Sequence, residues 1–476
     1  MIIRLIILFT FMSTFCSAQK YLHIYGKIQP KSSDSVSLYA YNSSFSHISG
    51  NKKMVYTTTL DADGNYKINI PWNETQEINL LNGDKYIVFN IFLSRGDSVE
   101  ITQVEDEFST NGKGSENIEY SFRFADKFYI DSSIRAEYAN SYGSKNISQF
   151  HDYILRRRDQ QLLFLEDFSY KNNLKPAVYE SERANIYYKY VVDKTQYLWK
   201  HNYANKKQGF LAVDSSYFSF LQDIKVSKNQ AEKSHYYYYF LHEYIDALWT
   251  MQISKLPDSV QKQKYAAQYL EKIELAEEKL VGKEKELAIA AIISRAIQNN
   301  DSGDSSIWQL FLKLKKNGID KELYNSLLAE YNAVNSLSGK PAPIFTAITQ
   351  NGEKFELASL KGKVVLLDIW STTCGPCLKN IPESVKLKNE LKDKPFETLN
   401  LCMSSSEESW KKLVIAGKWN GIHIFSKNDA ELYNNYRFKG FPQYILIDKN
   451  GNIVKLNADK PGSEHLKQEI LKLLAD

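Results

Sequence analysis

The sequence predicts a multidomain protein with a β-sandwich-like module at the N-terminus, an all-α middle region and a C-terminal α/β domain. At 476 residues the chain is too long for a single hydrophobic core. Apolar residues alternate at period two up to about residue 110 and then recur at three- and four-residue spacing. A polar stretch rich in Ser, Gly and Pro, residues 336–343, separates this helical pattern from a region where strands and helices alternate.

Composition and charge exclude several classes of protein. With 43% hydrophobic and 24% charged residues, the chain is not intrinsically disordered as a whole. A net charge of only +4 gives no reason to expect a nucleic-acid partner or an anionic membrane surface. The unusual feature is the aromatic content, with 32 Tyr and 24 Phe.

Residues 1–18 are typical of a cleavable signal peptide. Arg4 supplies a positive charge, an apolar run follows, and Ala18 is a small residue at the expected cleavage site. The run is shorter than the roughly 20 residues that a membrane-spanning helix needs. We expect export to the periplasm or cell envelope. Lipid attachment at Cys16 is the less favoured alternative, because the bulky Phe15 precedes it.

Residues 19–112 form the predicted β-rich module. The segments 21–28 and 36–41 alternate in the manner of strands, and 86–93 is a long β-type run. Several short strands at this spacing suggest a small antiparallel sandwich. No residue pattern here is typical of a catalytic site.

Residues 115–335 form the predicted helical domain. Its clearest helical spacing lies in 261–298, where Glu and Lys occupy the face opposite the apolar residues. Pro176 and Pro257 are expected to divide the region into several helices. The aromatic cluster 236–240 could be a recognition surface, but we favour rings that face the core of a helical layer.

The strongest functional pattern is a pair of cysteines where a strand passes into a helix. Cys374 and Cys377 follow the apolar run 364–369. A helix N-terminus favours a thiolate over a thiol, so this arrangement indicates redox chemistry. Zinc is disfavoured because a structural site needs four ligands and the sequence has no second C-x-x-C, so we expect no metal. Cys402 is interpreted as a small buried hydrophobe, with a third redox partner as the alternative.

Three motifs follow one another in residues 340–476: A-P-x-F, W-x-x-x-C-x-x-C and G-F-P-x-x-x-L-I-D-x-x-G. In this order they resemble the TlpA/ResA-like branch of the thioredoxin superfamily, over a little over a quarter of the chain. The resemblance implies a thioredoxin fold with helices on both faces of a mixed sheet. It also implies a thiol–disulfide oxidoreductase whose redox group is its own Cys374–Cys377 disulfide, with no further cofactor.

The resemblance implies roles for the residues of the cysteine motif. Cys374 would attack a substrate disulfide, and Cys377 would resolve the mixed disulfide. Gly375 and Pro376 match the dipeptide of thioredoxin itself, which favours a reductant. Pro382 is expected to interrupt the helix after the cysteines.

Asp368 matches the buried aspartate of thioredoxin, six residues before the first cysteine. A carboxylate on an apolar strand has a raised pKa because burial disfavours its charged form. It could then take a proton from the resolving cysteine. The alternative is a partly solvated acid at the end of the strand.

Pro442 matches the family's cis-proline, which would lie beside the cysteines. It would expose a backbone edge at Phe441 for pairing with a substrate strand. Phe441 is bulkier than the Thr or Val common at this position. Trp370 is retained from the family pattern, whereas Thr373 occupies the place where most relatives carry a second Trp.

These inferences predict an exported thiol–disulfide oxidoreductase that reduces disulfides of envelope proteins or cytochrome c maturation intermediates. Because that compartment is oxidising, a reductant there needs a membrane electron donor. The alternative is a partner-binding envelope protein whose thioredoxin fold is mainly a platform. The intact set of Cys374, Cys377 and Pro442 argues against an inert platform.

Overall fold

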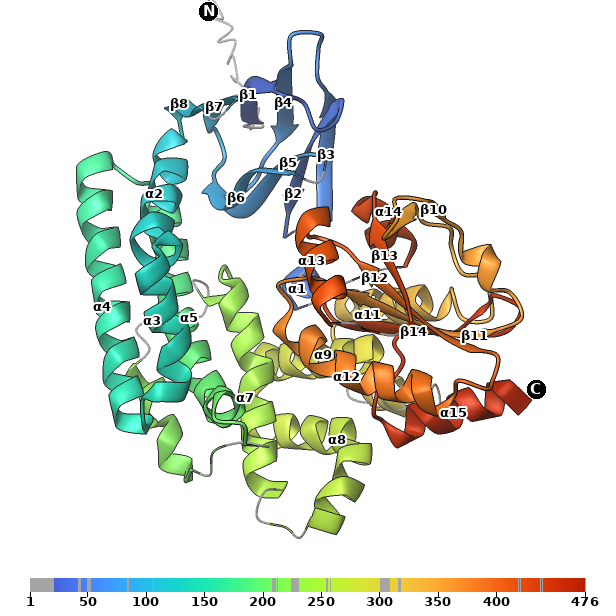
Figure 1. Ribbon diagram of the computed structural model, residues 1–476. Coiled ribbons are helices and arrows are strands. Elements are labelled where there is room, and N and C mark those ends of the chain that lie inside the picture. The colour runs from blue at the N-terminus through green and yellow to red at the C-terminus, as the bar shows by residue number, and fades with distance from the viewer. Residues whose placement is uncertain are drawn as a thin grey trace, which may run out of the picture. The chain divides into compact units, whose positions relative to one another are not determined.

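A computed structural model describes most of the chain (Figure 1). The described residues are 21–475 without 42–43, 49–52, 84, 106, 208–210, 212, 224–230, 254–255, 257, 300–308, 316–317, 418, 420, 437 and 439. The expected signal peptide and Pro257 therefore lie outside the described residues.

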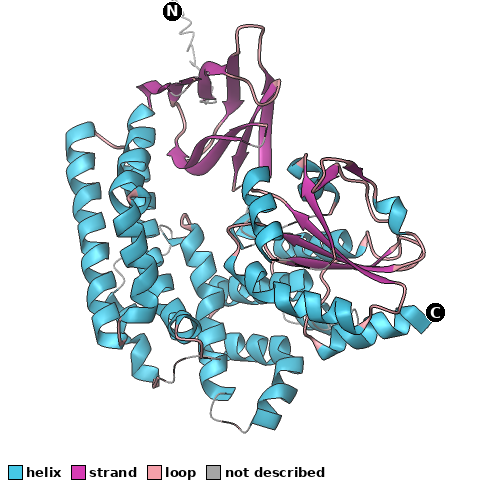
Figure 2. Ribbon diagram, viewed as in Figure 1, coloured by secondary structure: helices cyan, strands magenta, loops and turns pink. Residues whose placement is uncertain are grey.

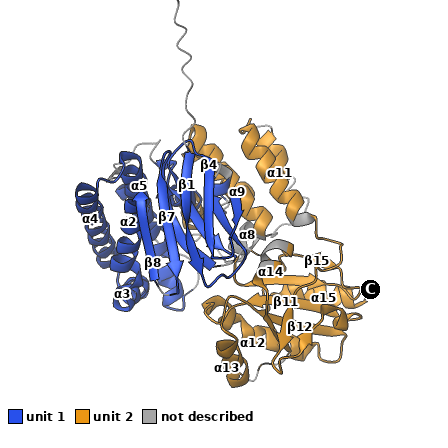
Figure 3. Ribbon diagram, turned by 90° about the horizontal axis from the view of Figure 1, so that it is seen from above, with its two compact units in different colours: residues 1–243 blue, residues 244–476 orange. Residues whose placement is uncertain are grey.

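Strands occur near both ends of the chain and helices fill its middle (Figure 2). The chain divides into two compact units, residues 1–243 and 244–476 (Figure 3). Of the helices in the described part of the chain, none is long and apolar enough to cross a membrane.

In the described part of unit 1, the N-terminal strands form two four-stranded sheets, ordered β4-β1-β7-β8 and β3-β2-β5-β6. The elements are β1 (Tyr21–Gln29), β2 (Ser35–Ala40), α1 (Ser44–Ile48), β3 (Lys53–Thr59), β4 (Asn65–Pro71), β5 (Gln76–Asn82), β6 (Lys85–Leu93), β7 (Ser98–Val104) and β8 (Glu107–Lys113). Along β4 the buried Tyr66, Ile68 and Ile70 alternate with exposed residues, as the period-two pattern requires. The buried side chains of both sheets belong to one apolar core.

Helices make up most of the rest of the described part of unit 1. They are α2 (Ser115–Ala125), the π-helix η1 (Asp126–Ile130), α3 (Ser132–Ser144), α4 (Ile147–Asn172), α5 (Pro176–Ala204), the 3-10 helix η2 (Ser215–Asp223) and α7 (His235–Ile253), which continues into unit 2. Pro176 begins α5, where its missing N–H costs no hydrogen bond. Three rings of the aromatic cluster, Tyr237, Tyr238 and Phe240, are buried, as the core-facing interpretation expects.

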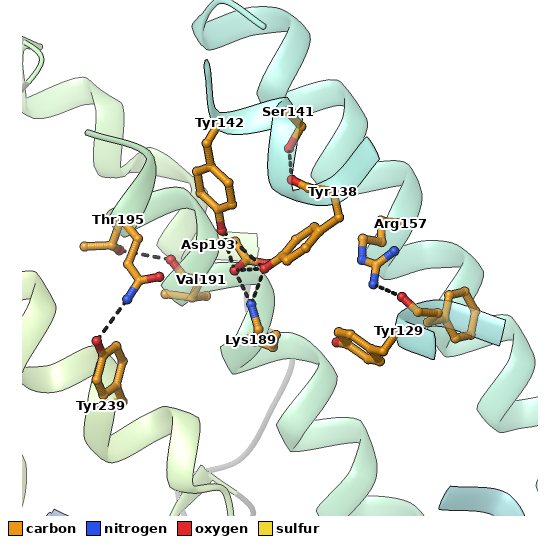
Figure 4. Close-up of polar contacts among 12 residues, drawn as sticks. Tyr129, Tyr138, Ser141, Tyr142, Arg157, Lys189, Val191, Asp193, Thr195 and Tyr239 are labelled. Atoms are coloured by element: carbon orange, nitrogen blue, oxygen red, sulfur yellow. Dashed lines mark hydrogen bonds and ion pairs between the residues drawn. The ribbon is translucent and has the colours of Figure 1, made fainter. Parts of the chain in front are cut away.

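A buried polar cluster joins α3 to α5 (Figure 4). The Asp193 carboxylate forms an ion pair with Lys189 and accepts hydrogen bonds from the hydroxyls of Tyr138 (2.7 Å) and Tyr142 (2.9 Å). Lys189 also donates to the Tyr138 hydroxyl at 2.5 Å. The guanidinium of Arg157, from α4, lies 4.8 Å from the centre of the Tyr138 ring. The cluster thus ties three helices together through charges that all have partners.

The described part of unit 2 contains helices, including a short helical stretch at 309–315, followed by a mixed α/β domain. Its elements are α8 (Asp258–Lys279), α9 (Gly282–Asn299), α11 (Lys321–Asn335), β9 (Ala347–Thr349), β10 (Lys354–Phe355), the 3-10 helix η3 (Leu357–Leu360), β11 (Val364–Trp370), α12 (Gly375–Glu390), β12 (Phe396–Cys402), α13 (Glu407–Gly417), β13 (Ile422–Ser426), α14 (Asp429–Asn435), β14 (Gln443–Ile447), β15 (Ile453–Lys455) and α15 (Glu464–Ala475). The sheet order is β10-β9-β13-β12-β11-β14-β15. β11 is parallel to β12 and antiparallel to β14.

The central strand β11 is buried along its whole length, which is expected for a strand covered on both faces. Alternate residues of β11 share a face. Val364 and Leu366 pack with side chains of α12 and α15, and Trp370 packs with side chains of α12 and α13. These three helices therefore cover one face of the sheet, and α12 begins where β11 ends.

The expectation that Pro382 interrupts the helix is wrong, because α12 runs through it. Pro382 lies on the exposed side of the helix. A proline there removes only one backbone hydrogen bond, and the carbonyl it frees can face solvent.

Candidate functional site

The two cysteines occupy the first turn of α12 and form a disulfide. Cys374 is the N-cap residue, and its Sγ accepts a hydrogen bond from the Cys377 amide at 3.1 Å. Cys374 is partly exposed, whereas Cys377 is 1% exposed. The first cysteine can therefore meet a partner from solution, and the second can reach only the first. The N–H groups of the helix start favour a thiolate at Cys374.

Hydroxyl groups hold the short link between β11 and α12. The Thr372 amide donates to the Ser405 hydroxyl at 3.0 Å, and the Ser371 hydroxyl lies 3.3 Å from the same Ser405 hydroxyl. The Met403 amide donates to the Trp370 carbonyl at 2.9 Å. The loop after β12 thus fixes the segment that presents the cysteines.

Asp368 lies on β11 two residues before Trp370, so both side chains point to the α12 face. It is 2% exposed, so it is not a partly solvated acid. Burial raises its pKa to about 7. Its Oδ1 has no hydrogen-bond partner among the described residues. Such a carboxyl group can hold or release a proton near neutral pH.

The loop before β14 carries the predicted cis bond between Phe441 and Pro442. The Phe441 ring lies 4.7 Å from that of Phe438. Phe441 and Cys374 pack against the same buried cluster, which includes Trp370 and Cys377. Sequence-distant parts of the predicted site therefore come together in space.

Four other predicted residues have simpler surroundings. Gly375 and Pro376 are exposed in the first turn of α12, and Thr373 is exposed just before Cys374. Cys402 is fully buried in the cluster around Trp370, where burial raises the pKa of its thiol to about 12. This environment fits a packing residue and not a third redox thiol.

Trp419 is a neighbour of the site that the sequence did not reveal. Its ring meets that of Trp370 edge-on, with centroids 5.8 Å apart. A Cβ atom at Gly417 would lie 2.2 Å from the Trp419 indole, so the glycine makes room for the ring. No local pattern marks Trp419, because only the fold brings it to Trp370.

Comparison with known proteins identifies the C-terminal region. Residues 337–470 match the Redoxin family model. The thiol-disulfide oxidoreductase ResA of Bacillus cereus is 31% identical over 135 residues, which are 28% of this chain and 78% of the relative. This chain belongs to the ResA-like thiol-disulfide oxidoreductases. A ResA protein from Bacillus anthracis is 27% identical over 166 residues, 34% of this chain and 93% of the relative.

Among solved structures, the thioredoxin domain of a thiol-disulfide oxidoreductase from Bacteroides vulgatus is 31% identical. It matches 29% of this chain and 97% of its own, with a TM-score of 0.27. The predicted family and enzyme class are confirmed, as are the thioredoxin-like C-terminus and the helix-rich middle. The roles of individual residues in this oxidoreductase stay predictions.

Proposed function

We propose that the oxidoreductase reduces disulfides of extracytoplasmic proteins by dithiol–disulfide exchange at Cys374 and Cys377. The observation that supports this most is the pairing of a partly exposed Cys374 at the start of α12 with a buried Cys377 in the same helical turn. The Cys374 thiolate attacks a substrate disulfide, forms a mixed disulfide and releases one substrate thiolate. The Cys377 thiolate then attacks the Cys374 sulfur and releases the second. Two electrons pass to the substrate, and the protein is left with its internal disulfide.

Asp368 serves the second step in this proposal. Cys377 must lose its proton before it can attack, and its burial disfavours the thiolate. The Asp368 side chain points to the face of the sheet that is covered by α12, the helix that carries Cys377. Its pKa of about 7 suits a general base at neutral pH.

The cis-proline loop supplies the substrate edge. A peptide strand would pair with the backbone at Phe441, beside Cys374, and Pro442 would keep that edge open. The Phe441 ring limits which substrate side chains fit next to the reacting cysteine. Trp370 packs in the buried cluster that contacts Cys374, Cys377 and Phe441.

The cellular setting completes the proposal. The signal-peptide pattern of residues 1–18 supports export, and Gly375-Pro376 supports the reducing direction with electrons from a membrane donor. Envelope proteins and cytochrome c maturation intermediates are the proposed clients. The β-sandwich-like module (19–112) and the helical domain (115–335) would precede the thioredoxin-like domain (340–476).

Insulin reduction by the mature protein, with dithiothreitol as the electron donor, tests the chemistry, and Cys374→Ser is the matched variant. We expect wild type to precipitate insulin B chain and the variant to remain at the uncatalysed rate. Equal rates would overturn the enzyme proposal and favour the platform alternative. A redox titration then sets the direction, because a potential of about −270 mV marks a reductant and one of about −120 mV an oxidant.

A further inference from the structure

The cis-proline loop is connected to a helix far away in the sequence. Gln443 directly follows Pro442, and it is the first residue of β14. Its side chain is 8% exposed. The Gln443 Nε2 donates to the Leu456 carbonyl and to Asn457 Oδ1, each at 3.1 Å. A buried amide thus holds the base of the loop to the chain just after β15.

Asn457 uses the other end of its amide to reach α9. Its Nδ2 donates to the main-chain carbonyl of Gln298, the penultimate residue of that helix. The last four carbonyls of a helix have no partner within it, so this bond satisfies a group that would otherwise need one. Asn457 therefore bridges the substrate loop and the end of α9.

The α9 end is itself fixed to α11. Gln298 Nε2 donates to Ser294 Oγ and to Glu330 Oε1, both at 3.0 Å, and Ser294 Oγ donates to Glu330 Oε2 at 2.7 Å. Ser294 is 2% exposed, whereas Gln298 and Glu330 are half-buried, so these bonds are partly shielded from solvent.

The chain after α11 then returns to the same edge of the sheet. The Gly339 amide donates to the Ile453 carbonyl at 2.7 Å, and the Ala342 amide donates to the Gly451 carbonyl at 2.9 Å. The α9–α11 pair is thus held to β15 on one side and, through Asn457, to the cis-proline loop.

We propose that Asn457 is a positioning residue for substrate binding, and that α9 and α11 belong to the apparatus that holds the cis-proline loop. This inference rests on the proposed function, in which a substrate strand pairs at Phe441. Loss of the bridge leaves the Gln443 side chain with only one of its two acceptors, the Leu456 carbonyl. The cis-proline loop before β14 then samples orientations in which its backbone edge is misplaced. The consequence is weaker binding of a strand-forming client with unchanged chemistry at the cysteines.

Two variants remove different hydrogen bonds of the Asn457 side chain. Asn457→Asp keeps an oxygen for Gln443 but loses the donor to the Gln298 carbonyl and sets a carboxylate against it. Asn457→Ala loses both arms. Ser338→Ala is the matched control, because it removes only an exposed hydroxyl bond to the Val454 carbonyl at the same sheet edge.

Steady-state reduction of insulin by the full-length protein measures the effect, with dithiothreitol as the electron donor that regenerates the Cys374–Cys377 dithiol. Single-turnover reaction of the pre-reduced protein with the small aromatic disulfide DTNB is the comparison, because this substrate needs no strand pairing. From the value of a single hydrogen bond, we expect both Asn457 variants to raise KM for insulin roughly threefold to tenfold. Turnover number and the DTNB rate should stay within about twofold, as should all three quantities for Ser338→Ala. An unchanged KM for insulin, or an equal loss with DTNB, would overturn the proposal.

Amide hydrogen exchange gives a second measurement that does not depend on activity. Peptides covering residues 441–447 should exchange faster in Asn457→Asp than in wild type, while peptides of β11 stay unchanged. Unchanged exchange in the loop would also overturn the positioning role. If wild type were no more active than Cys374→Ser, the proposed function would fail, and the exchange result would still decide the role of Asn457.

Discussion

Two aspartates in this oxidoreductase are equally buried but have opposite surroundings. Asp193, on α5, is 3% exposed and is surrounded by an ammonium group and two phenol donors. Asp368, on β11, is 2% exposed and has an oxygen without a hydrogen-bond partner among the described residues. Burial by itself therefore does not tell a structural acid from a chemical one.

The groups around each carboxylate distinguish the two aspartates. Burial alone would lower the pKa of Lys189, but Asp193 and the nearby phenols outweigh it and hold that pKa well above its usual value. Burial also raises the pKa of Tyr138 and Tyr142, so these phenols stay neutral at physiological pH. Lys189 therefore keeps its charge at physiological pH, whereas Asp368 can change charge near neutrality. A group that can change charge inside the fold is the one suited to proton transfer.

Removing the cation from the cluster should give the largest loss of stability. Lys189→Met leaves the Asp193 carboxylate buried without its counter-ion, and breaking a buried pair costs about 3–5 kcal/mol. Urea unfolding followed by far-UV circular dichroism measures the change. Lys171→Met is the control, since its pair with Asp167 is exposed and worth less than about 1 kcal/mol. A loss no larger than that of the control would contradict the structural role of the cluster.

Asp368→Asn should change kinetics and not destabilise the fold. The variant keeps the shape of the side chain but cannot accept the Cys377 proton, so we expect the resolving step to slow by about 10²-fold at pH 7. Single-turnover quenching that follows the mixed disulfide measures this step. Equal rates for the two proteins would rule out the role of Asp368, and normal attack by Cys374 on DTNB shows that the site is intact.

The pH dependence of stability provides a separate test of Asp368. Its folded pKa is raised from 3.8 to about 7, so between these values the folded state binds a proton that the unfolded state has lost. The unfolding free energy contributed by this group therefore falls as pH rises from about 4 to about 7 and is constant outside that window. Asp368→Asn should remove this fall, so that the unfolding free energy of the variant increases relative to that of wild type as pH rises from about 4 to about 7. Parallel curves for the two proteins would show that the carboxyl group does not titrate near 7.

The sequence was sufficient where the determining interactions are local. The β-branched run at 364–369 predicted β11, and the cysteine spacing placed Cys374 at the start of a helix. It was misleading at Pro382, because the exposure that lets a helix continue through proline is a tertiary property.

Features that depend on distant segments could not be predicted in the same way. Trp419 reaches Trp370 only because α13 ends at a glycine that leaves room for the indole. Asn457 and Gln298 are 159 residues apart in the sequence and meet only in the folded chain. Neither periodicity nor spacing marks such residues, since each is an ordinary polar or aromatic residue in its own segment.

The smallest expected effect measures how much a single hydrogen bond of the α3–α5 cluster contributes to the free energy of unfolding. Tyr142→Phe removes one hydroxyl from Asp193 but leaves Lys189 and Tyr138 in place, so we expect a loss of about 1–2 kcal/mol in urea unfolding. Tyr170→Phe is the control, because Tyr170 is 87% exposed and its hydroxyl can bond to water. Insulin reduction should be unchanged in both variants, since the cluster takes no part in the proposed chemistry. A fall in turnover with Tyr142→Phe would contradict the contrast between the two aspartates, because it would give the cluster a part in the reaction.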